Sequence, residues 1–146
     1  MKVLCVCLGN ICRSPTAEGV LRKLGGDAVV VDSAGTAGWH IGKPPYGPAV
    51  EAAGERGYDL TSLRARRFQA QDFHDFDLIL AMDAQNLADI EMMRPEGSET
   101  PVSLFLDYAP DTGRQEIPDP YYTRDFDEAL DLIEVAAQGL VRSLPR

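Results

Sequence analysis

One stretch of the sequence combines residue types suited to phosphoryl chemistry. Cys7 is followed after five residues by Arg13, and a Gly9-Asn10 pair lies between them. A short apolar run precedes the cysteine, and Ser14 followed by a proline is typical of a helix start. A loop of this size that runs from a strand into a helix points successive backbone N–H groups inward. Such a loop predicts an anion-binding site.

Each side chain of this stretch has a physical role in such a site. Gly9 permits a tight turn, and Asn10 tolerates a left-handed backbone conformation. Arg13 can direct two N–H donors at two phosphate oxygens. Cys7 lies at the base of the loop, where the field that binds phosphate also favours thiolate over thiol, and Ser14 can donate a hydrogen bond to that thiolate. This combination predicts metal-free phosphoryl transfer with a fixed nucleophile.

The alternative interpretation of Cys7 is a small buried apolar residue, as free cysteines usually are. That interpretation suits Cys5, which lies within the apolar run, and we adopt it there. For Cys7 it leaves the Gly-Asn turn and the arginine unexplained. We therefore expect the whole loop to bind phosphate, which makes the following residues candidate site residues: Leu8, Gly9, Asn10, Ile11, Cys12 and Ser14.

A proton donor should accompany the cysteine, because a cysteine nucleophile expels an alkoxide or phenoxide poorly without one. Asp119 is the candidate, since prolines on both sides stiffen its loop and fix where the carboxyl group points. An Asp-Pro pair is also common in ordinary turns. The spacing alone leaves both interpretations open.

Three aromatic residues are candidates for a substrate-binding surface. Trp39, the only tryptophan, lies between glycines in a loop. A lone tryptophan is more often a core residue, but this loop is hard to place in a core element, and an exposed ring can flank a phenyl group. Tyr121 and Tyr122 follow Asp119 closely and are candidates for the opposite wall.

Strand and helix patterns alternate along the chain and must position these residues. Apolar runs of strand length and amphipathic patterns with capping residues predict the elements. The predicted strands span residues 3–7, 28–31, 76–82 and 102–106. The predicted helices span residues 14–25, 48–57, 83–93 and 125–144, with Asp83 as a cap, and we expect loops at residues 35–48 and 117–122.

Repeated strand–helix units of this length predict an α/β fold, with a parallel sheet wrapped by helices and right-handed crossovers. In such folds the site lies at the carboxyl ends of the strands, which is where Cys7 falls. The sequence shows no repeat, low-complexity segment or linker. We therefore expect residues 1–146 to form a single domain.

Composition and charge narrow the function. The net charge is −9, which argues against nucleic acid or an anionic membrane as a partner. Three cysteines cannot all pair, and no apolar run has the length of a secretory core or a membrane span, so we expect a cytoplasmic protein.

The two histidines lack metal-ligand spacing, and we expect no metal or cofactor. Arg64, Arg66 and Arg67 are interpreted as a solvated face.

The loop resembles the signature of a known family, the low-molecular-weight protein tyrosine phosphatases. Residues 6–15, Val-Cys-Leu-Gly-Asn-Ile-Cys-Arg-Ser-Pro, match that signature almost residue for residue. The resemblance extends over the whole chain, including residues 36–45, 73–83 and 119–122. It implies a four-stranded parallel sheet with helices on both faces, in a flavodoxin-like, doubly wound arrangement. It also implies hydrolysis through a cysteinyl-phosphate intermediate on Cys7.

The resemblance assigns further roles. The aspartate of Asp-Pro-Tyr, here Asp119, is the family's general acid, and aromatic residues at positions 39, 121 and 122 line a deep slot that admits a phenyl phosphate. In related phosphatases a second loop cysteine, here Cys12, captures the oxidised nucleophile and protects it, whereas the alternative interpretation of Cys12 is a small residue that fills the loop. The expected partner is a phosphotyrosine-containing protein or a small aryl phosphate, and the expected assembly is a monomer or weak dimer. Family members often support the loop serine with a histidine, but that position is Leu63 here, which leaves the support of Ser14 open.

Three other functions are alternatives to a tyrosine phosphatase. An arsenate reductase on the same fold needs two further cysteines, and no cysteine follows Cys12. A phosphoarginine phosphatase tends to have threonine where this chain has Ile11, and a bulky apolar side chain there favours a flat aromatic ring, but this alternative stays open. A phosphate-binding module without turnover is expected to have lost Cys7, Arg13 or Asp119, and all three are present.

Overall fold

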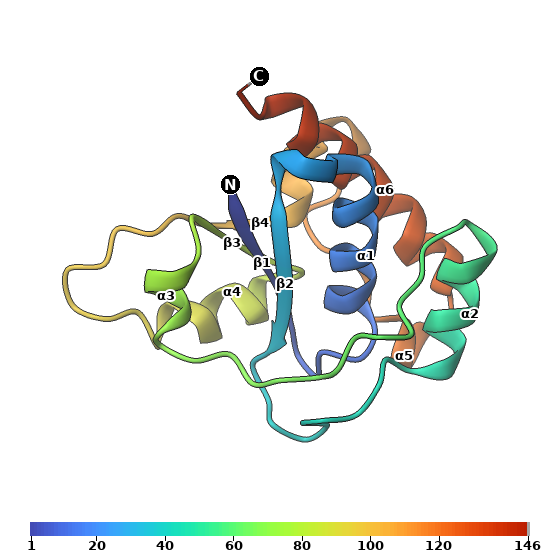
Figure 1. Ribbon diagram of the computed structural model, residues 1–146, viewed down its shortest axis with the longest axis horizontal. Coiled ribbons are helices and arrows are strands. Elements are labelled where there is room, and N and C mark those ends of the chain that lie inside the picture. The colour runs from blue at the N-terminus through green and yellow to red at the C-terminus, as the bar shows by residue number, and fades with distance from the viewer. Residues whose placement is uncertain (146) are drawn as a thin grey trace.

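The computed structural model describes residues 1–145 and shows a parallel sheet between two layers of helices (Figure 1). The strands lie in the order β2-β1-β3-β4 and are β1 (Lys2–Cys7), β2 (Val30–Gly35), β3 (Leu78–Ala81) and β4 (Val102–Leu104). The helices are α1 (Arg13–Gly25), α2 (Gly47–Glu55), α3 (Asp72–Asp75), α4 (Ala84–Glu91), α5 (Pro120–Thr123) and α6 (Phe126–Ser143). Four parallel strands with flanking helices confirm the predicted fold class.

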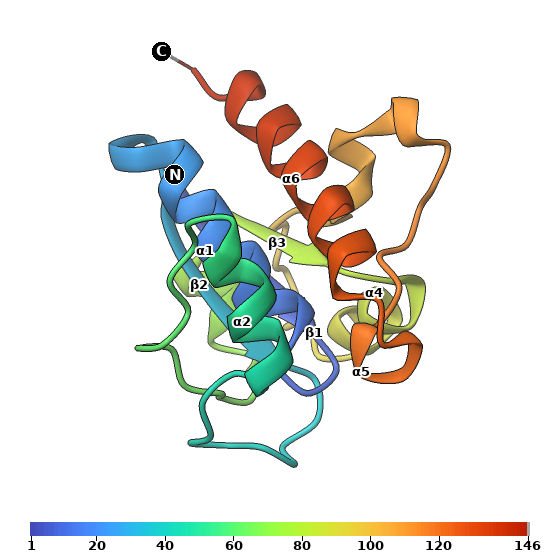
Figure 2. The same ribbon diagram turned by 90° about the vertical axis from the view of Figure 1, so that its right-hand side faces the viewer.

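The central strand β1 is apolar throughout because both of its faces are covered. Val3, Cys5 and Cys7 belong to the core formed with α1 and α6, whereas Leu4 and Val6 belong to a second core on the side of α3 and α4. Figure 2 shows α1, α2 and α6 together on one side of the sheet. Within residues 1–145, no helix combines the length and the apolar character needed to cross a membrane.

The second strand lies later in the chain than predicted. We expected residues 28–31, but β2 spans Val30–Gly35, and Gly26–Ala28 form a 3₁₀ turn. The apolar run ends at Asp32, which made the strand look shorter than it is. Its ladder with β1 nevertheless continues from the Lys2–Val30 pair to the Cys7–Gly35 pair. The small buried residues at the end of β2 therefore extend the sheet beneath the site.

Other element boundaries also needed correction. The fourth strand ends at Leu104 rather than 106, because the chain turns into a 3₁₀ helix over Phe105–Tyr108. The short helix α3 was not predicted. Residues 117–122 are not all loop, since Asp119 accepts a hydrogen bond from the Tyr121 N–H and starts the one-turn helix α5. The predicted cap at Asp83 is confirmed by a 2.7 Å hydrogen bond from the Asn86 N–H.

The carboxyl ends of the strands meet at one edge of the sheet, the lower edge in Figure 1. Backbone hydrogen bonds join the loops that leave them, so that each loop is positioned by its neighbour. These bonds run from Thr36 N to Cys7 O (2.9 Å), Ala37 N to Leu8 O (2.9 Å), Met82 N to Val6 O (3.2 Å) and Ile117 N to Met82 O (3.0 Å). The segments that follow the strands therefore lie together at this edge.

Gly35, the last residue of β2, lets the loop after β1 approach closely. A Cβ atom at this position would lie 2.8 Å from the Leu8 carbonyl oxygen and 3.1 Å from the Asn10 nitrogen, so the loop would have to move. We expect Gly35→Ala to lower turnover of an aryl phosphate by roughly ten- to a hundredfold, because small displacements of catalytic groups are costly. Steady-state kinetics would measure this loss.

Gly54→Ala is the matched control, since Gly54 lies in α2 and a Cβ atom there meets nothing within 4 Å. It should leave turnover unchanged and stabilise the helix by about 0.5–1 kcal/mol. Equal turnover in both variants would show that the loop tolerates the displacement.

Candidate active site

The loop after β1 curls around the sulfur of Cys7. Asn10 adopts a left-handed conformation with φ 57°, and its N–H donates to Cys7 Sγ at 3.3 Å. Ser14 Oγ lies 3.0 Å from the same sulfur. Cys12 occupies the N-cap position of α1 without capping it through its side chain, which leaves first-turn N–H groups for an anion. Two donors therefore converge on the sulfur, which suits a thiolate.

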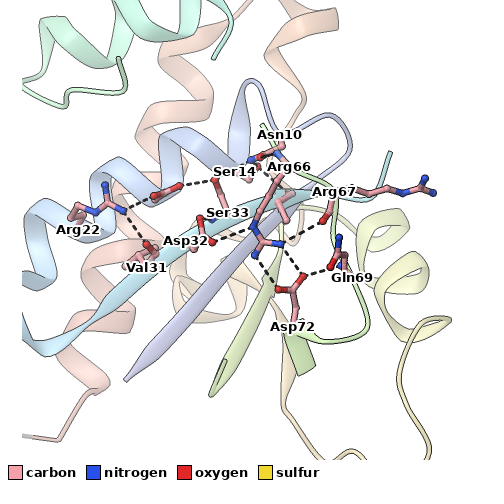
Figure 3. A network of polar contacts seen from close by, with 12 residues as sticks. Asn10, Ser14, Arg22, Val31, Asp32, Ser33, Arg66, Arg67, Gln69 and Asp72 are labelled. Atoms are coloured by element: carbon pink, nitrogen blue, oxygen red, sulfur yellow. Dashed lines mark hydrogen bonds and ion pairs between the residues drawn. The ribbon is translucent and has the colours of Figure 1, made fainter. Parts of the chain in front are cut away.

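The side-chain amide of Asn10 connects this loop to β2 and to the segment before α3 (Figure 3). Its Nδ2 donates to Ser14 Oγ at 2.7 Å and to Ser33 Oγ at 3.0 Å. Its Oδ1 accepts the Arg66 N–H at 2.9 Å. Because the Ser14 oxygen accepts from Asn10, the Ser14 hydrogen is available to Cys7 Sγ at 3.0 Å or to the Ala34 carbonyl at 3.4 Å, and the sulfur is the nearer of the two.

A buried carboxylate ends this chain of hydrogen bonds. Ser33 Oγ donates to Glu18 Oε1 at 2.7 Å, and Arg22 donates to the other oxygen of Glu18. Burial raises the pKa of Glu18, and the two donors lower it in part. The Ser33 hydrogen goes to Glu18, and the Ser33 oxygen accepts from Asn10.

Leu63 contributes no hydrogen bond to this arrangement. It is partly buried and packs against the core that α1 and α6 share. The donor that reaches Ser14 comes from Asn10 instead. The support of Ser14, which the sequence left open, therefore comes from within the loop itself.

Arg66 was wrongly interpreted as part of a solvated face. Its guanidinium donates to both carboxylate oxygens of Asp72, at 3.1 and 3.0 Å, and to Asp32 at 3.2 Å. This pairing ties the segment before α3 to β2, as Figure 3 shows. It holds the Arg66 N–H against Asn10. Arg64 and Arg67 are exposed, as expected.

The guanidinium of Arg13 lies at the centre of the site with 3% of its side chain exposed. Nη1 donates to Asp83 Oδ2 at 2.7 Å and to the Ile117 carbonyl at 2.9 Å, and Nη2 lies 3.4 Å from Asp119 Oδ2. Burial lowers its pKa, but the negative charges of Cys7, Asp83 and Asp119 outweigh burial and raise it. Arg13 Nε is buried and has no acceptor within the described residues, which suits an incoming anion.

Asp119 faces this arginine from the start of α5. Its Oδ1 accepts the Tyr121 N–H at 3.1 Å, and its Oδ2 lies toward Arg13. Pro120 is buried at the first helical position, where its fixed backbone suits a helix start. The Asp119 side chain is 22% exposed, so it can exchange a proton with solvent or with a bound molecule.

A cavity of about 170 Å³ brings together most of the candidates. The candidates that line it are Cys7, Leu8, Gly9, Ile11, Cys12, Arg13, Trp39, Asp119, Tyr121 and Tyr122. Asn10 and Ser14 are buried and do not line it, although both contact the Cys7 sulfur. The sulfur, the guanidinium and the carboxyl group therefore share one cavity with apolar and aromatic walls.

The rim of the cavity is aromatic and exposed. Trp39, Tyr121 and Tyr122 have 66%, 43% and 69% of their surfaces exposed, which excludes a core role. His40 also lines the cavity and packs close to Gly9. Sequence reasoning missed it, and its place beside Trp39 was the available signal.

Cys12 lines the cavity but is 4% exposed. Burial, reinforced by the charges of Asp119 and Cys7, raises the pKa of its thiol to about 12, although Arg13 and Arg124 act in the opposite direction. Cys12 is therefore a protonated thiol at neutral pH. Cys5 lies fully buried in β1, where burial raises the pKa of its thiol, in keeping with an inert core residue.

The Asn10 contacts can be tested without disturbing the backbone. Glycine adopts a positive φ readily, so Asn10→Gly removes the amide and keeps the loop conformation. The change leaves buried polar groups unsatisfied, at about 1–3 kcal/mol each, and frees the Ser14 hydroxyl to turn away from Cys7. We expect a lower unfolding temperature and a kcat lowered by roughly tenfold or more. Asn10→Ala should lower the unfolding temperature and kcat more than Asn10→Gly does, because alanine is strained at this positive φ. Equal kcat in Asn10→Gly and wild type would contradict the role of the Asn10 amide in supporting Cys7.

The sequence is similar to those of known phosphatases. The family model for low molecular weight phosphotyrosine protein phosphatase matches residues 2–146. The low molecular weight protein-tyrosine-phosphatase YfkJ of Bacillus subtilis is 39% identical over 151 residues, covering 100% of this chain and 97% of the relative. The low molecular weight phosphotyrosine protein phosphatase of Schizosaccharomyces pombe is 43% identical over 128 residues, covering 84% and 81%.

Solved structures extend the likeness to three dimensions. The crystal structure of YfkJ has a TM-score of 0.92 at 40% identity and covers 98% of this chain and 93% of its own. The crystal structure of a Drosophila arginine phosphatase has a TM-score of 0.89 at 34% identity, with coverage of 97% and 96%. Both the sequence and the fold match over nearly their full length. The chain belongs to the low molecular weight phosphotyrosine protein phosphatase family.

Proposed function

We propose that this protein hydrolyses phosphotyrosine and aryl phosphate monoesters in two chemical steps. Cys7 is the nucleophile, Arg13 binds the phosphoryl group and Asp119 is the general acid. The observation that carries the proposal is that one cavity holds all three side chains, with Arg13 in contact with Asp119. A fixed nucleophile, a buried cation and a proton donor are the parts that phosphoryl transfer needs.

In the first step the Cys7 thiolate attacks phosphorus and forms an S–P bond. The P–O bond to the substrate breaks, and Asp119 gives its proton to the departing phenol oxygen. Arg13 and the loop N–H groups hold the three remaining phosphate oxygens, whose charge they stabilise. Ser14 keeps the sulfur in line through the contact of 3.0 Å.

In the second step water attacks the phosphorus of the cysteinyl phosphate. The Asp119 carboxylate, now without its proton, accepts one from that water. The S–P bond breaks, inorganic phosphate forms and the Cys7 thiolate returns. Neither step requires a metal ion, because Arg13 and the backbone N–H groups supply the positive field.

The aromatic rim supports an aryl substrate. Trp39 and the tyrosines of α5 can contact both faces of a phenyl ring, and Ile11 presents an apolar side chain within the cavity. The second candidate function is a phosphoarginine phosphatase, which the likeness to the Drosophila arginine phosphatase favours. Its guanidinium substrate would also meet an aromatic wall.

A direct assay separates these functions. We expect the protein to release phosphate from phosphotyrosine and 4-nitrophenyl phosphate in the presence of EDTA, with a higher kcat/KM on phosphotyrosine than on phosphoarginine. A reversed order would favour the arginine activity. Inhibition by EDTA, relieved by added metal, would contradict the metal-free mechanism.

The role of Asp119 predicts a dependence on the leaving group. A phenol with a pKa of about 10, like that of tyrosine, needs a proton as it departs, whereas a more acidic phenol departs almost unaided. Asp119→Asn should lower bond cleavage on phosphotyrosine by roughly 10²–10⁴-fold and affect activated aryl phosphates much less. Plots of kcat/KM against leaving-group pKa should be steeper for the variant; parallel plots would mean that Asp119 only shapes its loop.

We also propose that Cys12 protects the nucleophile. Peroxide converts Cys7 to a sulfenic acid, and the Cys12 thiolate then attacks that sulfur and expels hydroxide, which leaves a Cys7–Cys12 disulfide. Dithiothreitol reduces the disulfide and restores both thiols. The common loop and the shared cavity support this pairing.

The raised pKa of Cys12 gives this protection a pH dependence. With a pKa of about 12, the thiolate fraction of Cys12 increases about tenfold for each pH unit between 7 and 9. Formation of the disulfide, followed by mass spectrometry after peroxide treatment, should accelerate accordingly. Cys12→Ser should stay active but lose recovery by dithiothreitol; recovery equal to wild type would make Cys12 a structural residue only.

We propose that the protein acts in the cytoplasm as a monomer or weak dimer. All three cysteines are unpaired, as is usual in a reducing compartment. Its net charge of −9 disfavours nucleic acid as a partner. Sedimentation velocity at micromolar concentration would test the assembly, and a stable higher oligomer would contradict it.

A further inference from the structure

Two non-glycine residues near the site have a left-handed backbone conformation. Among residues 1–145, the only non-glycine residues with positive φ are Asn10, at 57°, and Arg124, at 65°. Arg124 follows α5 directly and ends it, with its N–H bonded to the Pro120 carbonyl at 2.9 Å. A left-handed conformation is unfavourable for an arginine and easy for a glycine, so contacts of the side chain must compensate.

The Arg124 side chain makes contacts of that kind. Its Nη1 donates to the Tyr46 hydroxyl at 3.1 Å and to the Tyr121 carbonyl at 3.3 Å. Its guanidinium carbon lies 5.4 Å from the ring centroid of Tyr46 and 5.6 Å from that of Phe126. These are cation–π distances, and they place the arginine between the end of α5 and the start of α6.

Tyr46 connects this arginine to the phosphate-binding loop. Its N–H donates to the Ile11 carbonyl at 2.8 Å, and its carbonyl accepts from Ala49 N at 2.9 Å in the first turn of α2. Its ring lies 5.2 Å from that of Tyr121. The backbone of Tyr46 is therefore fixed to the loop that surrounds Cys7, while its side chain holds α5.

The segment that carries Asp119 needs such an anchor during the reaction. The contact of 3.4 Å between Arg13 and Asp119 depends on a charged carboxylate. When Asp119 carries the proton that it donates, that attraction is lost, and Arg13 turns its donors to phosphate oxygens. A single helical turn does not hold its own position. The contacts of Tyr46 and Arg124 do not depend on the charge of Asp119.

We propose that Tyr46 and Arg124 are positioning residues that hold α5 against the phosphate-binding loop, so that protonated Asp119 stays at the leaving oxygen. This inference rests on the function proposed above and adds two residues that act through Asp119. It also explains an arginine with φ 65° where glycine would be relaxed.

Three variants separate the contacts. Arg124→Gly removes the side chain and relaxes the backbone, so the fold is retained. Arg124→Lys keeps the charge without the planar group, and Tyr46→Phe keeps the ring without the hydroxyl acceptor. We expect Arg124→Gly to lower kcat/KM on phenyl phosphate by roughly tenfold, and on 4-nitrophenyl phosphate by less than about threefold, because the less acidic phenol needs the proton more. Arg124→Lys and Tyr46→Phe should lie between this variant and wild type.

A double-variant cycle decides whether these residues act through Asp119. In the Asp119→Asn background, Arg124→Gly should cause no further loss on phenyl phosphate, because residues that act only through one group show no effect once it is gone. Arg142→Gln is the matched control, since Arg142 is an exposed arginine in the last turn of α6, and it should behave as wild type. Thermal unfolding of each variant verifies the fold.

The outcomes are distinct. A leaving-group-dependent loss that vanishes in the Asp119→Asn background supports the inference. Equal losses on both substrates, additive losses in the double variant, or wild-type kinetics in Arg124→Gly would overturn it while leaving the proposed function intact. An inactive wild-type protein would overturn the proposed function and this inference with it.

Discussion

The buried guanidinium of Arg13 is the interaction on which the rest of the site depends. A cation with 3% of its side chain exposed is strongly disfavoured unless it is paired, and the partners of Arg13 come from segments that follow other strands. Asp83 follows β3, and Ile117 and Asp119 follow β4. The shortest of these contacts is the ion pair with Asp83, at 2.7 Å, and it persists when Asp119 is protonated. The position of the general-acid candidate is thus tied to the residue that binds the phosphoryl group.

The sulfur of Cys7 is positioned in a different way, by neutral donors rather than by charge. The Asn10 N–H and the Ser14 hydroxyl contact it, and the Asn10 amide donates to the oxygen of that hydroxyl. Glu18 lies at the far end of the chain, beyond Ser33, where its charge is separated from the thiolate. Because the hydrogen bonds that support Cys7 run through Ser14 and Asn10, they do not need a hydrogen-bonding side chain at position 63.

The sequence predicted the parts of the site that are local or follow from strand direction. The loop from Cys7 to Arg13 is contiguous, and Cys7 falls at the carboxyl end of a predicted strand. Asp119 was a candidate from its flanking prolines and the family resemblance, whereas Asp83 was predicted only as a helix cap and its contact with Arg13 was not. The pairing of Arg66 with Asp72 and the approach of Ser33 to Asn10 were not predictable, because they depend on the register of β2. The prolines around Asp119 predicted a loop and not the helix α5. A helix of one turn is too short to show a periodic pattern of apolar residues. The roles of the site residues remain predictions that kinetics must test.

The central claim is that Cys7 carries the phosphoryl group between the two steps. Rapid mixing of the protein with an aryl phosphate that carries a radiolabelled phosphate group, followed by rapid denaturation and peptide mapping, tests it directly. The account predicts label on the peptide that contains Cys7 during turnover, and none in Cys7→Ser, which should still bind inorganic phosphate through Arg13 and the loop N–H groups. Turnover by the wild-type protein without label on that peptide, or label on another residue, would contradict the covalent mechanism.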